Sequence, residues 1–78
     1  MDLENIILQV NEIMTEGFEV KPELLTPEAN LYEDLGLDSL DSVDLVVALE
    51  KTFNHRIVEE DARQIKTLQD IYNYIQNK

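Results

Sequence analysis

The chain has 78 residues without a cysteine, and its 17 acidic residues outnumber six basic ones to give a formal net charge of −11. This length predicts one domain over residues 1–78, which is too small for a deep catalytic cleft. The sequence has no cysteine for disulfides and no signal-peptide pattern. It also has no apolar run near the roughly 18 residues of a membrane span. We therefore expect a cytoplasmic monomer without membrane insertion or a nucleic-acid partner, whose protein partners present basic patches, unless the acidity serves only solubility.

The first helix is predicted over residues 2–16, because apolar residues recur there at the spacing of one helix face. Asp2 can cap its start, and Gly17 suits a left-handed residue at its end. Residues 18–38 form the longest irregular stretch, which Pro22 and Pro27 interrupt. This stretch should nevertheless pack over the core, because it is rich in apolar residues. They are Phe18, Val20, Leu24, Leu25, Leu31, Leu35 and Leu37.

Three more helices are predicted after this loop. The first of them spans residues 39–54, where Gly36 permits a sharp turn before the helix and Asp38 is a good N-cap. A short helix over residues 59–64 precedes a last helix, which starts at Thr67 with a capping box to Asp70. The last helix should turn four side chains inward: Leu68, Ile71, Tyr72 and Ile75. Together these elements predict an all-α fold, a small four-helix bundle of three longer helices and one short helix, with a long loop between helices 1 and 2.

The helix over residues 39–54 carries two apolar stripes. At about 100° per residue, the first stripe gathers Leu45, Val46, Leu49 and Phe53, and the second, roughly 140° away, gathers Leu40, Val43 and Val47. A domain this small cannot easily bury both stripes. The second stripe, with Asp41 and Asp44 beside it, is therefore predicted to be a docking surface. The alternative is a central helix that buries both.

The segment EDLGLDSLDSVDLV, residues 33–46, closely resembles the signature of the acyl carrier proteins. The resemblance extends to residues 74–75 and includes the first helix by pattern and length. It implies that residues 1–78 form a single acyl-carrier domain, and that Ser39, between Asp38 and Leu40, receives a 4′-phosphopantetheine arm from coenzyme A through a phosphopantetheinyl transferase. A serine in the first turn of a helix also lies near unpaired N–H groups, where a phosphodiester fits.

The same resemblance implies a carrier and not an enzyme. Acyl intermediates would be held as thioesters on the arm, for fatty-acid or related polyketide-like biosynthesis, and the acyl chain could fold back between helices. Candidate residues for lining that space are Val46, Leu49, Ala62 and Ile65. Acyl-transferring and acyl-modifying enzymes are expected to contact Asp41, Val43, Asp44, Val47 and Glu50. We expect no catalytic residue and no metal site, since no serine or carboxylate is spaced to make His55 a catalytic base and the acidic run lacks the order of a calcium loop.

Two alternatives stay open at this point. One is a specialised carrier of another cargo, such as D-alanine or a peptidyl precursor, and the other is an acidic helical adaptor that is never modified. Lys51, His55 and Arg56 interrupt the acidic run that is typical of the family, and Val58 replaces a frequent proline. These residues either balance local charge or mark a specialised carrier.

Overall fold

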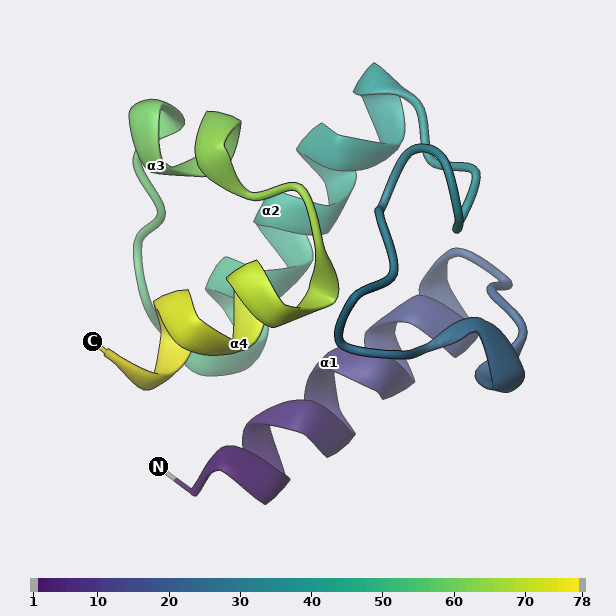
Figure 1. The fold of residues 1–78 in the computed structure, drawn as a ribbon. Helices are drawn as coiled ribbons and strands as arrows, with labels where there is room; N and C mark the ends of the chain where they lie inside the picture. Colours follow the sequence, from purple (N-terminus) through teal and green to yellow (C-terminus); the bar gives the residue numbers. More distant parts are fainter. Residues whose placement is uncertain (1, 78) are drawn as a thin grey trace.

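The computed structural model describes residues 2–77, in the order α1 (Leu3–Gly17), the one-turn 3₁₀ helix η1 (Pro22–Leu24), α2 (Ser39–Phe53), α3 (Glu59–Gln64) and α4 (Leu68–Gln76). Within these residues no strand forms, apart from an isolated antiparallel bridge between Asn30 and Thr67. Figure 1 shows α3 and α4 on one side of α2 and the long loop after α1 on the other. The predicted all-α fold, with three longer helices, one short helix and a long first loop, is confirmed. No helix in the described part is long and apolar enough to cross a membrane.

Capping residues set most helix ends where the sequence predicts them. The Thr67 hydroxyl accepts the Asp70 N–H at 3.2 Å, and the Asp70 carboxylate accepts the Thr67 N–H at 3.1 Å, which is the predicted capping box. α2 ends one residue early, because Asn54 turns left-handed with φ 50° and donates its N–H to the Glu50 carbonyl. Asp2 holds the N-cap position of α1 as predicted, but its side chain makes no capping hydrogen bond.

The end of α1 differs from the prediction. Gly17 is the last helical residue and is not left-handed; the positive φ, 56°, falls on Glu19 instead. The N–H groups of Phe18 and Val20 both donate to the Met14 carbonyl, at 3.2 and 3.1 Å. The chain therefore reverses two residues later than predicted, which brings the Val20 side chain into the core.

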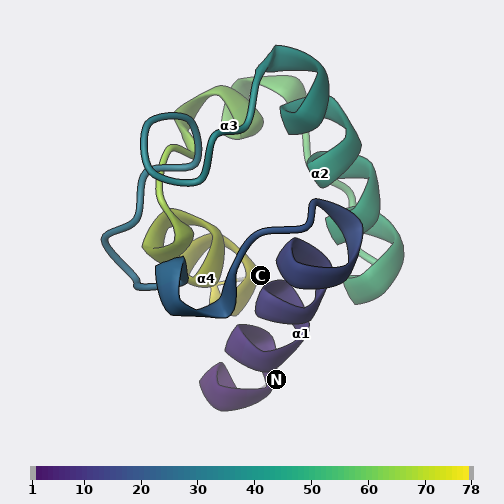
Figure 2. The same cartoon turned by 90° about the vertical axis from the view of Figure 1, so that its right-hand side faces the viewer.

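The loop over residues 18–38 packs over the core, as its apolar content predicts. Backbone hydrogen bonds fasten it to the start of α4: the Leu31 N–H donates to the Lys66 carbonyl at 2.8 Å, and the Leu68 N–H donates to the Ala29 carbonyl at 3.2 Å. Figure 2 shows this loop passing α4 on its way to the start of α2. Leu24 is an exception to the prediction and stays exposed, because η1 turns Leu25 and not Leu24 toward the core. The other apolar loop residues are buried or half-buried: Phe18, Val20, Leu25, Leu31, Leu35 and Leu37.

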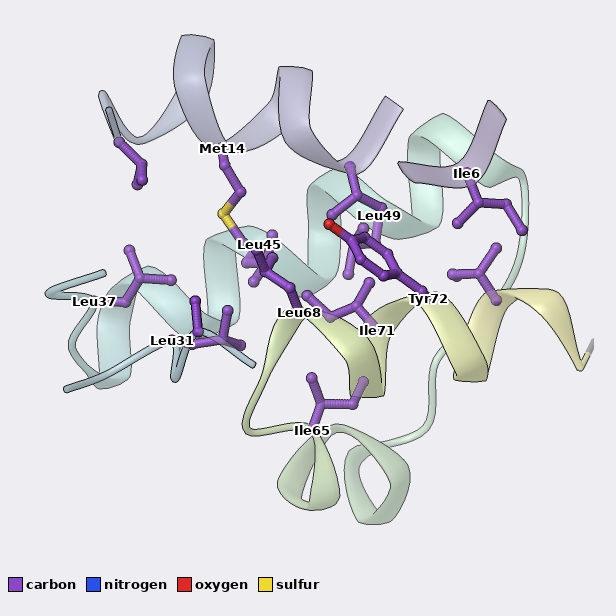
Figure 3. Packing of buried hydrophobic residues seen from close by; sticks show 14 of the residues in the cluster. Ile6, Met14, Leu31, Leu37, Leu45, Leu49, Ile65, Leu68, Ile71 and Tyr72 are labelled. Carbon is purple, nitrogen blue, oxygen red and sulfur yellow. The ribbon is translucent and has the colours of Figure 1, made fainter. Parts of the chain in front are cut away.

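The core lies where α1, α2 and α4 face one another (Figure 3). The side chains predicted to point inward from α4 are all buried there. Tyr72 brings one polar group into this interior, and its hydroxyl points toward α1 and donates to Asn11 Oδ1 at 2.7 Å. The principal buried residues of the three helices are Ile6, Val10, Met14, Leu45, Leu49, Leu68, Ile71, Tyr72 and Ile75.

Candidate functional site

Ser39 is the first residue of α2, and it is exposed. Gly36, with φ 75°, makes the predicted sharp turn just before it, in a conformation that glycine adopts at little cost. The Asp38 carboxylate accepts the Asp41 N–H at 2.9 Å, and the Asp41 carboxylate accepts the Asp38 N–H at 3.2 Å. The predicted N-cap is thus one half of a reciprocal capping box. Its second half was missed, although an acidic residue three positions after the cap is a signal for it.

This capping box leaves two backbone donors of α2 beside the Ser39 hydroxyl. The N–H groups of Asp38 and Asp41 are bonded to carboxylates, whereas those of Ser39 and Leu40 have no acceptor within residues 2–77. The free donors lie at the positive end of the helix dipole, where an anion is stabilised by about 0.3–1 kcal/mol. An exposed hydroxyl next to two unpaired N–H groups therefore suits a phosphodiester substituent.

The outer face of α2 carries an apolar strip, which we define as Leu40, Val43 and Val47. These side chains are 75%, 60% and 42% exposed, whereas Leu45 and Leu49 on the inner face are 2% and 1% exposed. The alternative interpretation, a central helix that buries both stripes, is therefore wrong. Helix α2 buries one apolar stripe and presents the other to solvent.

The three carboxylates predicted to contact partner enzymes differ in the hydrogen bonds that they already make within the chain. Asp44 is exposed, and its carboxylate makes no hydrogen bond or ion pair with any residue that the structure describes. The Asp41 carboxylate takes part in the capping box, and the half-buried Glu50 accepts the Ile57 N–H on Oε2 at 2.9 Å. Asp44 is consequently the most available of the three carboxylates.

The residues predicted to line an acyl space come together in the structure. They surround one small cavity of about 20 Å³ under α2, which is completed by residues from the long loop and from α2 itself. A cavity of about this size accepts little more than one water-sized sphere, so an acyl chain does not fit without movement of the walls. A larger open groove of about 500 Å³ between α2 and α3 adjoins it. Four residues line both spaces: Tyr32, Ser42, Val46 and Ala62. The predicted residues around the small cavity are Val46, Leu49, Ala62 and Ile65.

The groove between α2 and α3 also has a charged edge, which is not among the features predicted from the sequence. Arg63 and Glu59 line it from α3 and form an ion pair of 2.9 Å. Both side chains are well exposed, so the pair contributes little to stability. The i, i+4 spacing of the two residues is a sequence signal for the pair. Its place beside the groove depends on how α3 packs against α2, which the spacing does not reveal.

A polar contact away from Ser39 connects α3 with α4. The Tyr74 hydroxyl donates to Asp61 Oδ2 at 2.8 Å, and the His55 ring meets the Tyr74 ring edge-on with centroids 6.2 Å apart. Desolvation raises the pKa of Tyr74, and the adjacent Asp61 carboxylate raises it further. In the part of the chain that the structure describes, no group of three or more His, Cys, Asp or Glu side chains could hold a metal ion.

The sequence is similar to a known protein family and to individual known proteins. A family model described as "Phosphopantetheine attachment site" matches residues 9–75. The chain is 44% identical over 75 residues to an acyl carrier protein of Syntrophobacter fumaroxidans. The aligned residues make up 96% of this chain and 93% of that relative. It is also 44% identical over 78 residues to an acyl carrier protein of Thermosynechococcus vestitus. Here the aligned residues make up 100% of this chain and 96% of the relative.

Proposed function

This chain belongs to the acyl carrier protein family, and on that premise we propose that Ser39 is the residue that receives the phosphopantetheine arm. The cofactor of the family is 4′-phosphopantetheine, and its terminal thiol, when the arm is attached, holds an acyl group as a thioester. The chain is accordingly a carrier and not an enzyme. The observation that supports Ser39 is its exposed hydroxyl at the start of α2, beside the unpaired N–H groups of Ser39 and Leu40.

The neighbours of Ser39 have separate parts in this proposal. Asp38 holds the first turn of α2 through the capping box and so keeps the Ser39 hydroxyl at the helix start. Leu40 exposes an apolar side chain directly beside the attachment residue. A modifying enzyme can bury this side chain when it binds, which gives contact area close to the reacting hydroxyl.

The outer face of α2 is the proposed docking surface for the phosphopantetheinyl transferase and for acyl-transferring and acyl-modifying enzymes. Its apolar strip supplies area that binding can desolvate, and Asp44 supplies an unpaired charge for enzymes with basic patches. The net charge of −11 favours such partners at long range. A cytoplasmic location and a monomeric state belong to the same proposal.

The lining of the small cavity under α2 favours a hydrocarbon cargo. Apolar side chains form most of its wall, with Tyr32 and Ser42 at the side that it shares with the larger groove. We therefore place the chain in fatty-acid or related polyketide-like biosynthesis, with the acyl chain entering between α2 and α3 as Val46 and Ala62 move apart. D-alanine or a peptidyl precursor would bring charged or polar groups against this wall without partners for them.

Intact-protein mass spectrometry tests the attachment directly. After incubation with a phosphopantetheinyl transferase and coenzyme A, the native chain should gain the mass of one arm, whereas Ser39→Ala should gain none. Ser42→Ala is the matched control, because Ser42 lies in the same helix one turn away and should leave attachment intact. A modified Ser39→Ala chain would contradict the assignment. A native chain that gains no mass would support the unmodified adaptor.

A further inference from the structure

A second open groove, with a volume of about 490 Å³, lies between α1 and α2. Asp44, Ala48 and Thr52 line it from α2, at the i, i+4 and i+8 spacing of a single helix edge. By helix geometry this edge lies about 105° around α2 from the apolar strip, on the side away from α3. Figure 2 shows α1 and α2 next to each other along this side of the molecule. The groove is therefore separate from the one that adjoins the small cavity.

The floor of this groove is apolar and remains open. Ile13 and Phe18 are half-buried and pack on the core beneath it, while Ala48 adds only a methyl group. At Gly17 a Cβ would meet no atom within 4 Å. The small residues Gly17 and Ala48 therefore leave open space above a partly exposed apolar surface, and a partner can cover that surface.

The rim of the groove is acidic and uncompensated. Glu12 and Glu16 lie one turn apart on α1, and Asp44 faces them from α2. Among residues 2–77, no lysine, arginine or histidine lines the groove. The ion pair seen within residues 2–77 joins Arg63 to Glu59 and leaves all three carboxylates of the rim unpaired.

We infer that this groove binds a short basic amphipathic helix of a partner protein. The apolar face of that helix would cover Ile13 and Phe18, while its lysine or arginine side chains would lie along Glu12, Glu16 and Asp44. The α2 edge from Asp44 to Thr52 is about 12 Å long, which matches roughly two helical turns. A second copy of this chain is a poor occupant, because it also carries a net charge of −11.

This binding surface does not require the arm on Ser39. The residues that line the groove include neither Ser39 nor any member of the apolar strip. A partner helix in this groove would leave Ser39 and the apolar strip open to an enzyme, although it would cover Asp44, which the proposed docking surface also uses. The inference therefore stands or falls independently of the proposed attachment.

A synthetic peptide provides the first test on the full chain. The probe is a fluorescent helix of about 14 residues, with leucines along one face and lysines flanking them, and the control is a scrambled peptide of the same composition. At physiological ionic strength the amphipathic peptide should bind about tenfold more tightly than the scrambled one. Amide shifts in the NMR spectrum should change within residues 9–18 and 44–52. Equal binding of both peptides, or shifts centred on the apolar strip, would overturn the inference.

Charge reversals in the chain provide the second test. Glu12→Lys/Glu16→Lys should weaken peptide binding about tenfold, because like charges would then face the lysines. Glu4→Lys/Glu28→Lys is the matched control, since it changes the net charge equally at exposed residues outside the groove, and it should weaken binding less than about threefold. Equal weakening by the two double variants would mean that net charge alone attracts the peptide and would overturn the inference. Ser39→Ala should bind the peptide as the native chain does.

Discussion

The two faces of α2 have similar apolar side chains but opposite environments. Leu45 and Leu49 on the inner face are buried against α1 and α4, whereas Val43 and Val47 on the outer face meet solvent. Apolar character alone therefore does not decide burial in this molecule. A domain of this size has too few elements to surround any one helix, so α2 must leave a face uncovered. The inner face stabilises the fold, and the outer face is left for recognition.

The largest expected effect comes from the inner face. Leu49→Ala should lower the free energy of unfolding by about 2–5 kcal/mol, because it removes a buried side chain and leaves a cavity. Val47→Ser on the outer face should change it by no more than about 0.5 kcal/mol. Urea denaturation of both variants measures the difference.

The same two variants also test the recognition part of the comparison. Val47→Ser should weaken binding to a phosphopantetheinyl transferase, because an apolar contact of the docked complex is lost. If Val47→Ser destabilises the free chain as much as Leu49→Ala does, the outer face belongs to the core. The docking proposal would then have to be withdrawn.

Local signals in the sequence predict most of the fold. The sequence predicts the bounds of α2 and α3 and the start of α4 to within a residue, with the help of the caps at Asp38 and Thr67. The course of residues 18–38 does not follow from the sequence in the same way, because backbone bonds such as Leu31 N–H to Lys66 fix it, and these carry no side-chain signal. For the same reason the sequence predicts a left-handed residue at Gly17, whereas the structure has it at Glu19.

The candidate site divides in a similar way. A linear motif identifies Ser39, and helix geometry within one element separates the inner face of α2 from the apolar strip. Features that depend on how two helices pack were not predicted, among them the groove between α1 and α2 and the place of the Arg63–Glu59 pair beside the groove between α2 and α3. The hydrogen bond from the Ile57 N–H to Glu50 was also missed, because it depends on the path of the chain after α2.

The cap of α2 should have the next largest effect, because it fixes where the helix begins and hence the direction of both faces. Asp38→Ala should lower the free energy of unfolding by about 0.5–2 kcal/mol, since the Asp41 N–H loses its acceptor. Asp44→Ala is the control, and its effect should stay within about 0.5 kcal/mol because the Asp44 side chain has no hydrogen-bond partner within the described residues. Urea denaturation compares the two variants. Equal losses would show that the capping box does not stabilise α2.

A smaller effect is expected from charge beside the apolar strip. Asp44→Lys should lower the association rate constant with a phosphopantetheinyl transferase about threefold at low salt, which corresponds to about 0.7 kcal/mol. The decrease should shrink at physiological ionic strength, where charges are screened over about 8 Å. Stopped-flow binding at two salt concentrations measures it, with Glu4→Lys as the control for net charge. If both variants slow association equally, Asp44 has no special position in docking.

The smallest effect on the free energy of unfolding at neutral pH is expected from Tyr72, in the interior that the inner face of α2 covers. Burial raises the pKa of Tyr72 above its ordinary value of 10.0, and the hydrogen bond to Asn11 offsets this only in part. The folded protein therefore holds the neutral phenol more strongly than the unfolded chain does. This contribution to stability is complete below about pH 10 and is lost as the pH rises through the folded pKa.

Urea denaturation between about pH 8 and pH 11 can test this expectation, because the free energy of unfolding should fall above the unfolded pKa of tyrosine. Tyr72→Phe should flatten the fall in part, since it removes one of the two tyrosines whose pKa is raised in the folded protein and leaves the other, Tyr74. Tyr32→Phe is the matched control, because it makes the same substitution at a side chain that is 41% exposed at the edge of the groove between α2 and α3. The pKa of Tyr74 is also raised, but Tyr74 is common to all three proteins, so its contribution cancels in the comparison. Identical slopes would mean that ionising Tyr72 does not oppose folding. Water would then reach the interior beside Leu49 more easily than its burial indicates, and the contrast between the two faces of α2 would be weaker than we describe.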